Sequence, residues 1–393
     1  MSTQVFSLVP PPLTEGCQLP GCAITFSSGQ IGLQRCSVCK AVAYCSREHQ
    51  LDNWKAHKPF CNKIKALQNK LEDEERNLLS STDIFQDPKN IGYFGTLPET
   101  NNYMHARKRV FWALAYESEG LLGLKLAVEH GREMLRLCTL DRLNVKYILP
   151  GVLVRIGEDQ RAYDLCRYWL DYCFEPFVSS SEGGNVVERY LRPEYLNRDV
   201  FEPIPTHWLE SRAGVLPLGL IVPVTLLKLR AYVDLGMLIE RFGGGVWDVS
   251  ILDPVALNEA KSQRPFGISE CVLRGRSSQA DNHAQNIDRR SFWNLHSLLS
   301  GQLTPLLGLI NRYNGFFLSA LIDSDSGLPS PGPDSASART RGSTLQSYLN
   351  ATPTYYADGS AEEAQVLVQY NWKSWVGDEA VMKEVRRRLE EGA

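Results

Sequence analysis

Most of the chain has the hydrophobic periodicity of amphipathic helices. Between positions 145 and 156, and again between 162 and 173, apolar residues recur at intervals of three and four. This spacing gathers the apolar side chains on one face of a helix. Pro150 interrupts the first stretch and indicates a kink or a new start, and Gly157 suits the position just after a helix. The two stretches therefore predict a helical hairpin with a short turn.

The same reasoning predicts further helices, separated by stretches rich in glycine, proline, serine or asparagine. Helices are expected over residues 62–80, 103–117, 121–138, 208–242, 289–300, 303–323 and 378–391. The longest apolar run, Val215–Leu227, has 13 residues and two prolines. It is too short to cross a bilayer, so a buried helix is expected there. The remaining stretches, 82–101, 174–206 and 324–343, are expected to be a linker, an irregular segment and a disordered loop.

Composition and charge bound the class of protein. The chain has 393 residues, which suggests two or three domains, with 43% hydrophobic and 22% charged residues. The net charge of −3 does not demand a nucleic acid or an anionic membrane as partner. The N-terminus lacks a basic region followed by an apolar one, so no secretory signal is expected. These features predict an intracellular protein of the cytoplasm, the nucleus or both.

Six of the ten cysteines and two of the seven histidines lie within residues 17–61. They form four pairs at metal-ligand spacing: Cys17 and Cys22, Cys36 and Cys39, Cys45 and His49, His57 and Cys61. Interleaved histidines are typical of zinc sites in a reducing compartment and not of a disulfide scaffold. Zinc takes four nitrogen or sulfur donors in a tetrahedron, so eight donors predict two closed, structural sites. The spacing alone leaves open which pairs share an ion.

Zinc would also supply the stability that this short segment lacks. A module of 45 residues with few large apolar side chains is near the lower size limit for unaided folding. A structural zinc ion contributes on the order of 10–16 kcal/mol to the folding of small modules. The two ions are therefore expected to hold residues 17–61 together.

This pattern resembles a MYND-type zinc finger. The matching residues are Cys36-Ser37-Val38-Cys39, Tyr44-Cys45-Ser46, His49-Gln50, Trp54, His57-Lys58 and Cys61. The resemblance implies two interleaved zinc sites, one of Cys17, Cys22, Cys45 and His49 and the other of Cys36, Cys39, His57 and Cys61. The sequence departs from the family twice, since four residues separate the first two cysteines where two are usual, and His49 replaces a usual cysteine. Imidazole also binds zinc, so the second departure should preserve the site.

The resemblance further implies a function. Most MYND fingers are protein-interaction modules that take short proline-rich peptides, and Gln50 and Trp54 match positions at the peptide groove. An exposed tryptophan is a natural platform for a polyproline helix, although Trp54 could instead belong to the small core of the finger. Residues 10–13, Pro-Pro-Pro-Leu, resemble such a ligand. They are expected to be part of a disordered lead-in, or to occupy the groove of their own finger or of a neighbouring molecule.

The helical region carries a weaker resemblance. Residues 148–160, with Tyr163, Asp164 and Trp169, resemble the region behind the finger in a group of fungal MYND proteins. Some of those are linked to ubiquitin-ligase substrate choice or to cell polarity. The hairpins resemble tetratricopeptide-type stacking, without a regular 34-residue period. The expected fold is thus a small two-zinc, cross-braced MYND finger followed by a mainly α-helical domain with hairpin, repeat-like packing.

The expected domain limits follow from these features: a disordered lead-in over 1–16, the finger over 17–61, a charged helix and linker over 62–101, a helical domain over 102–323, a disordered loop over 324–343 and a C-terminal helical segment over 344–393. No hydrolase, metalloprotease or nucleotide-binding motif is present. A SET-type lysine methyltransferase is disfavoured, because only 16 residues precede Cys17 and no Asn-His-x-x-x-Pro-Asn stretch follows.

The sequence therefore predicts a non-enzymatic adaptor that uses the finger to capture a partner, with a nuclear transcriptional or chromatin cofactor as the alternative. Partners would be proteins with proline-rich peptides, such as ubiquitin-ligase or transcriptional components, and not membranes. Nucleic acid is disfavoured, because the basic excess over 35–70 is followed at once by the acidic run 72–75.

Overall fold

The computed structural model describes residues 13, 15–25, 32–81, 84–85, 87–174, 195–211, 216–245, 249–273, 291–322, 349, 353 and 355–392. They divide into two compact units. The N-terminal unit comprises the described residues up to Ile156 with residues 195–196, and the C-terminal unit comprises residues 157–174 and those from Asn197 onward. The prolines at 10–12, the loop 324–343 and most of the segment 174–206 lie outside the described residues.

The N-terminal unit begins with the finger. Strands β1 (Gln34–Arg35) and β2 (Ala43–Tyr44) pair antiparallel, with Gln34 opposite Tyr44. Helix α1 (Arg47–Asp52) follows, and helix α2 (Trp54–Ser81) starts two residues after it ends. Ser46 caps α1, since its hydroxyl accepts a hydrogen bond from the His49 N–H at 3.2 Å. The cap fixes the start of the helix that carries His49.

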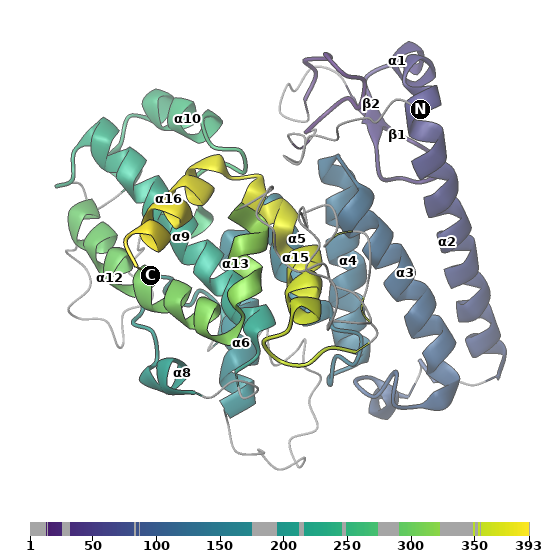
Figure 1. Ribbon diagram of the computed structural model, residues 1–393. Coiled ribbons are helices and arrows are strands. Elements are labelled where there is room, and N and C mark those ends of the chain that lie inside the picture. The colour runs from purple at the N-terminus through teal and green to yellow at the C-terminus, as the bar shows by residue number, and fades with distance from the viewer. Residues whose placement is uncertain are drawn as a thin grey trace, which may run out of the picture. The chain divides into compact units, whose positions relative to one another are not determined.

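Helix α2 is longer than the sequence predicted. The expected helix over 62–80 and the last part of the finger form one helix of 28 residues. Ile64, Leu71 and Leu78 repeat every seventh position and are buried, so a single apolar stripe runs along it. Helix α2 packs against helix α3 (Asn101–Glu117) (Figure 1). The finger is therefore joined to the helices of its unit through a continuous helix.

Three further helices complete this unit. Helix α3 packs on α4 (Leu121–Leu137), which packs on α5 (Val145–Arg155), and all three match expected helices within a few residues. Gly131 allows this close approach, because a Cβ there would lie 3.1 Å from the Phe111 ring and 3.2 Å from the Leu149 side chain. Before α3, the expected linker contains two short 3₁₀ helices, η2 (Pro88–Asn90) and η3 (Pro98–Thr100).

The C-terminal unit is built around helix α9 (Leu218–Phe242). Every residue from Leu218 to Ala231 is buried, which confirms the buried helix expected from the apolar run. Its neighbours are α6 (Asp159–Phe174), α11 (Glu270–Leu273), α12 (Phe292–Tyr313), α15 (Ala361–Val376) and α16 (Glu379–Glu390) (Figure 1). A helix enclosed on all sides is largely apolar around its circumference, and its buried polar side chains, such as Lys228 and Arg230, are hydrogen-bonded.

Smaller elements fill the rest of this unit: α8 (Thr206–Glu210), η5 (Val249–Ile251), α10 (Pro254–Ser262) and α13 (Gly315–Ile322). The expected break near residue 302 is wrong, because α12 continues through Pro305 to Tyr313, and the break comes at Asn314. The side chain of Asn314 explains the break: its Oδ1 accepts from the Phe316 N–H at 3.1 Å, and its Nδ2 donates to the Ser360 carbonyl at 3.0 Å.

A cluster of buried charges crosses the C-terminal unit. Arg230 on α9 is fully buried, and its guanidinium donates to Asp159 at 3.0 Å and to Asp378 at 2.9 Å. Arg264 donates to Asp234 at 2.5 Å and to both carboxylate oxygens of Asp378 at 2.8 and 2.7 Å. The cluster connects α6, α9, the segment after α10 and the start of α16.

Among the described residues, no helix is long and apolar enough to cross a membrane.

Candidate metal centre

The first group of donors begins in the loop before β1. Gly16 pairs with Thr25, and Cys17 pairs with Ala43 of β2. Gly16 has no room for a side chain, since a Cβ would lie 2.0 Å from the Ile24 carbonyl oxygen. Gly21 has φ +82°, and the Cys22 N–H donates to the Leu19 carbonyl at 3.1 Å. The four residues between Cys17 and Cys22 thus form a turn, which accommodates the unusual spacing of this pair.

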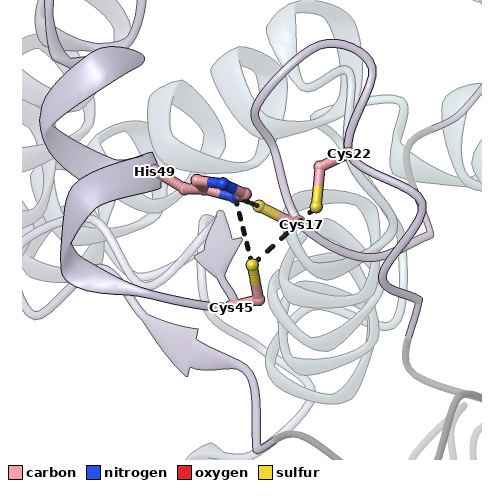
Figure 2. A group of neighbouring side chains, drawn as sticks. All are labelled: Cys17, Cys22, Cys45 and His49. Atoms are coloured by element: carbon pink, nitrogen blue, oxygen red, sulfur yellow. Dashed lines mark hydrogen bonds between the residues drawn. The ribbon is translucent and has the colours of Figure 1, made fainter.

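Four side chains meet at this first site (Figure 2). Cys17 Sγ lies 3.5 Å from His49 Nδ1, and Cys45 Sγ lies 3.1 Å from the same nitrogen. Cys22 Sγ lies 3.8 Å from Cys45 Sγ. Cys17 is buried and the other three are partly exposed. The loop, the end of β2 and helix α1 each contribute to this Cys₃His group.

The second group lies between the turn after β1 and the start of α2. Cys36 Sγ is 3.8 Å from Cys61 Sγ, and Cys39 Sγ is 3.6 Å from His57 Nε2. Lys40 takes a left-handed conformation at φ 58° and donates its N–H to the Cys36 carbonyl at 2.9 Å, which closes the turn between the two cysteines. All four donors are buried.

The donor distances fit zinc. With Zn–S bonds of about 2.3 Å and Zn–N bonds of about 2.0 Å, a tetrahedral site separates two sulfurs by about 3.8 Å and a sulfur from a nitrogen by about 3.5 Å. Both sulfur–sulfur distances are 3.8 Å, and the sulfur–nitrogen distances are 3.1, 3.5 and 3.6 Å. All the donor atoms of each group lie within 4.8 Å of one another. Each group can therefore surround one ion with four protein ligands.

The protonation chemistry of the donors also calls for a cation. Burial raises the pKa of Cys39 to about 12 and, together with the neighbouring thiols, that of Cys45 to about 11. A hydrogen bond from the Ile24 N–H lowers the pKa of Cys22. Burial lowers the pKa of His57, which keeps its imidazole neutral and able to donate a lone pair. Three adjacent thiolates require a positive ion between them, and bound Zn²⁺ supplies that charge.

The grouping is cross-braced. The first and third pairs along the chain make one site, and the second and fourth pairs make the other. Pairing in chain order would have placed Cys36 and Cys39 beside Cys17 and Cys22, and the structure does not bring these four together. The fold class predicted from the sequence, a cross-braced finger with two structural zinc ions, is therefore confirmed.

Asn53 is a supporting residue that sequence reasoning missed. It lies between α1 and α2 and is buried, and its Nδ2 donates to the Gln18 carbonyl and to the Tyr44 hydroxyl, both at 3.2 Å. These bonds hold the loop of the first site against the helix of the second. An isolated asparagine carries no spacing signal, so this role could not be predicted from the sequence.

Gln50 and Trp54 lie beside the sites and are not among the metal donors. Trp54 is the first residue of α2 and is 39% exposed, with its ring 6.1 Å from that of His57 in an edge-on arrangement. Gln50 is partly exposed, and its Oε1 accepts a hydrogen bond from Arg47 at 2.5 Å. Trp54 is thus held next to a zinc ligand while part of its indole faces solvent.

Comparison with known proteins agrees with this geometry. A family model described as MYND finger matches residues 22–61. Cys17 lies just outside the match and is joined to the finger by its position in the first site. No curated protein and no solved structure gives a significant match to the chain. The N-terminal segment of this chain is therefore a MYND finger, a zinc-binding domain of the protein-interaction type with two Cys₃His sites.

Proposed function

We propose that this protein is an adaptor, not an enzyme, and that its finger captures a proline-containing peptide of a partner protein on the surface around Trp54. The observation that carries the proposal is the partial exposure of this indole on a frame fixed by two metal sites. Leu51, at 58% exposure, is also left in solvent by the finger. A rigid aromatic surface of this kind suits a polyproline helix, which needs little further ordering to bind.

The frame around Trp54 supports a preorganised site. Its neighbour Asn53 is buried and bonded on two sides, and His57, one turn further along α2, is a zinc donor. The backbone that carries the indole therefore cannot move far without disturbing the second site. A surface ordered before binding retains more of its interaction energy as affinity.

The proposal that the protein is not an enzyme rests on the donor sets. Four protein ligands fill a tetrahedral zinc shell and leave no position for a reactive water. All the cysteines whose side chains are described are free thiols, and six of them are the donors of the two sites. Because thiolate ligands survive best in a reducing environment, we also place the protein inside the cell, in the cytoplasm, the nucleus or both.

Peptide binding tests this function directly. Fluorescence anisotropy of a labelled Val-Pro-Pro-Pro-Leu peptide would be measured against the full-length zinc-loaded protein. Trp54→Ala should weaken binding about tenfold or more, since buried aromatic anchors dominate such interfaces. The matched control is Trp293→Ala, which removes a 58% exposed tryptophan from α12 in the C-terminal unit. Equal affinities in the three proteins, with zinc content unchanged, would refute the proposal.

The partner class can be tested in the same way. Affinity purification of the full chain and of Trp54→Ala, followed by mass spectrometry, should show partners that depend on the indole. We propose that these are ubiquitin-ligase components, with transcriptional or chromatin components as the alternative outcome. Partners that are identical for both baits would place the interaction surface elsewhere.

A further inference from the structure

Charge is unevenly distributed along α2. Its first twelve residues, Trp54–Lys65, contain four lysines and no acidic residue. The acidic residues of the helix come later, in the run of four at 72–75. A helix normally favours acidic side chains near its N-terminus, because the backbone dipole is positive there. The beginning of α2 therefore places positive charge where the helix itself disfavours it.

Most of the other cations on this helix have partners. Lys63 pairs with Glu117 at 2.6 Å, Lys70 with Glu74 at 2.6 Å and Arg76 with Asp73 at 3.1 Å. Within the part of the chain that the structure describes, no ion pair is formed by the three exposed lysines of the first turns: Lys55, Lys58 and Lys65. Departures from local electrostatic preference without a compensating contact are expected at functional sites.

Two of these lysines share a face with Trp54. At 3.6 residues per turn, Lys58 and Lys65 lie within about 40° of Trp54 around the helix axis. The buried residues His57, Cys61 and Ile64 lie about 60°, 20° and 80° from Trp54 on the opposite side from the two lysines, so the stripe borders the buried face. The exposed indole is thus followed along the helix by two exposed ammonium groups.

Other charges near the stripe come from α1 and from the metal sites. Arg47 on α1 is exposed and donates to Gln50 at 2.5 Å, which adds a third cation beside the position implied for peptide contact. Glu48 and Asp52 are exposed one turn apart on a different face of α1. Each Cys₃His site with Zn²⁺ has a net charge of −1, but its charges lie among buried or partly buried donors. The solvent-facing side of Trp54 therefore remains cationic.

We propose that the peptide bound by the finger is acidic: an apolar, proline-containing core stacks on Trp54, and flanking aspartate or glutamate residues pair with Lys58, Lys65 and Arg47. This inference rests on the peptide-binding function proposed above. A peptide fits the patch better than a nucleic acid does. The interval Lys55–Lys65 spans only about 15 Å of helix. The acidic run at 72–75 that follows would repel a continuing phosphate backbone.

The test compares peptides that differ only in flanking charge. Full-length zinc-loaded protein would be titrated into labelled Val-Pro-Pro-Pro-Leu flanked on each side by three glutamates, three glutamines or three lysines. At 50 mM NaCl the glutamate peptide should bind about tenfold more tightly than the glutamine peptide, as expected for three exposed ion pairs. At 1 M NaCl, where the screening length falls to about 3 Å, the ratio should approach one.

Charge reversal on the protein assigns the effect to the patch. Lys58→Glu and Lys58→Glu/Lys65→Glu should each reduce the glutamate preference, and the double variant should abolish it. Arg76→Glu is the matched control, a charge reversal on the same helix at 73% side-chain exposure and about 27 Å further along the axis. Arg76→Glu should change the glutamate preference by less than about twofold, because the distance from residue 76 to the patch exceeds the screening length.

The outcomes separate this inference from the function on which it rests. Equal affinity for the three peptides, with all binding lost in Trp54→Ala, would overturn the acidic preference and leave peptide capture intact. No binding of any peptide would overturn both. Two further controls would overturn the inference by showing a general attraction of polyanions. One is a glutamate-flanked peptide with a Gly-Ser core, and the other is a single-stranded oligonucleotide. If either bound as tightly as the glutamate-flanked Val-Pro-Pro-Pro-Leu peptide, the preference would not be specific for an acidic proline-containing peptide.

Discussion

Replacing Arg230 by methionine should strongly destabilise the C-terminal unit. The guanidinium is fully buried and bonds to Asp159, to Asp378 and, at 3.3 Å, to the Gly267 carbonyl. Methionine retains much of the apolar length but removes the charge. Asp378 would keep Arg264, whereas Asp159 would lose its only charged partner in the cluster. Breaking a buried ion pair from one side costs about 3–5 kcal/mol, because the remaining charge is left without compensation.

The loss should depend on pH in a defined direction. Burial without a neighbouring cation disfavours the charged form of a carboxyl group, so the cost of the unpaired charge should fall as the pH is lowered. The difference in unfolding free energy between wild type and Arg230→Met should therefore be largest near pH 7.5 and smaller near pH 5. The effect of burial is already visible at Asp234 in the same cluster. Burial raises the pKa of this carboxyl group even though two arginines, Arg264 and Arg230, lie beside it.

Urea unfolding followed by tryptophan fluorescence measures the change, and hydrogen exchange of peptides from α9 locates it in the C-terminal unit. The matched control is Arg387→Met, which removes an arginine whose side chain is 46% exposed and which pairs with Glu384 and Glu391. A surface pair of this kind is worth about 0–1 kcal/mol. A loss below about 1 kcal/mol for Arg230→Met, or one independent of pH, would refute this account of the buried cluster.

Three further predictions concern the finger. The first site, with three partly exposed donors, should release zinc to a chelator before the second site, whose donors are all buried. A colorimetric zinc-release assay should therefore show two phases. A single phase would contradict the role given to this difference in burial. Gly16→Ala should weaken zinc retention, because the added Cβ would collide with the Ile24 carbonyl. The control Gly32→Ala should retain zinc as the wild type does, because its added Cβ would meet nothing within 4 Å. Equal zinc retention in the two variants would contradict the tight packing at Gly16. Acidification from pH 7 to 5 should release zinc from the full chain, because protons compete for thiols such as Cys39 with a pKa of about 12; retention measured by native mass spectrometry at pH 5 would contradict this.

Much of the finger could be predicted because ligand spacing is a local property. A Cys-x-x-Cys turn and two i, i+4 pairs are visible in the sequence without knowledge of the fold. The pairing between distant donors depends instead on how β2 lies against the loop of Cys17, and that contact has no local signal. The interleaved arrangement was therefore available only through the resemblance to MYND fingers, and the geometry later agreed with it.

Helices with one clean apolar face were predicted well, and those with mixed faces were not. Helix α15 lies within the helical segment expected over 344–393, but its limits were not predicted, because it buries polar residues such as Gln365, Gln369 and Asn371 beside its apolar ones. The sequence analysis also divided α12 between residues 300 and 303, whereas the helix continues through this point and the break comes at Asn314.

Long-range packing limits what periodicity can show. The two helices of the expected hairpin, α5 and α6, both form, but α5 packs on α4 in one unit and α6 packs on α9 in the other. The buried arginines were also unpredictable, since a charged residue in the sequence normally indicates a solvent-facing position. Their partners Asp159, Asp234 and Asp378 come from three distant segments.

The most direct test of the central claim is zinc stoichiometry of the full-length chain by native mass spectrometry, for the wild type and for Cys36→Ser. The structure predicts two zinc ions per wild-type chain and the loss of at least one from the variant, since Cys36 is a donor of the second site. A wild-type chain that binds one zinc ion would contradict the two-site finger. A chain that binds none would contradict the metal centre on which the proposed peptide surface is built.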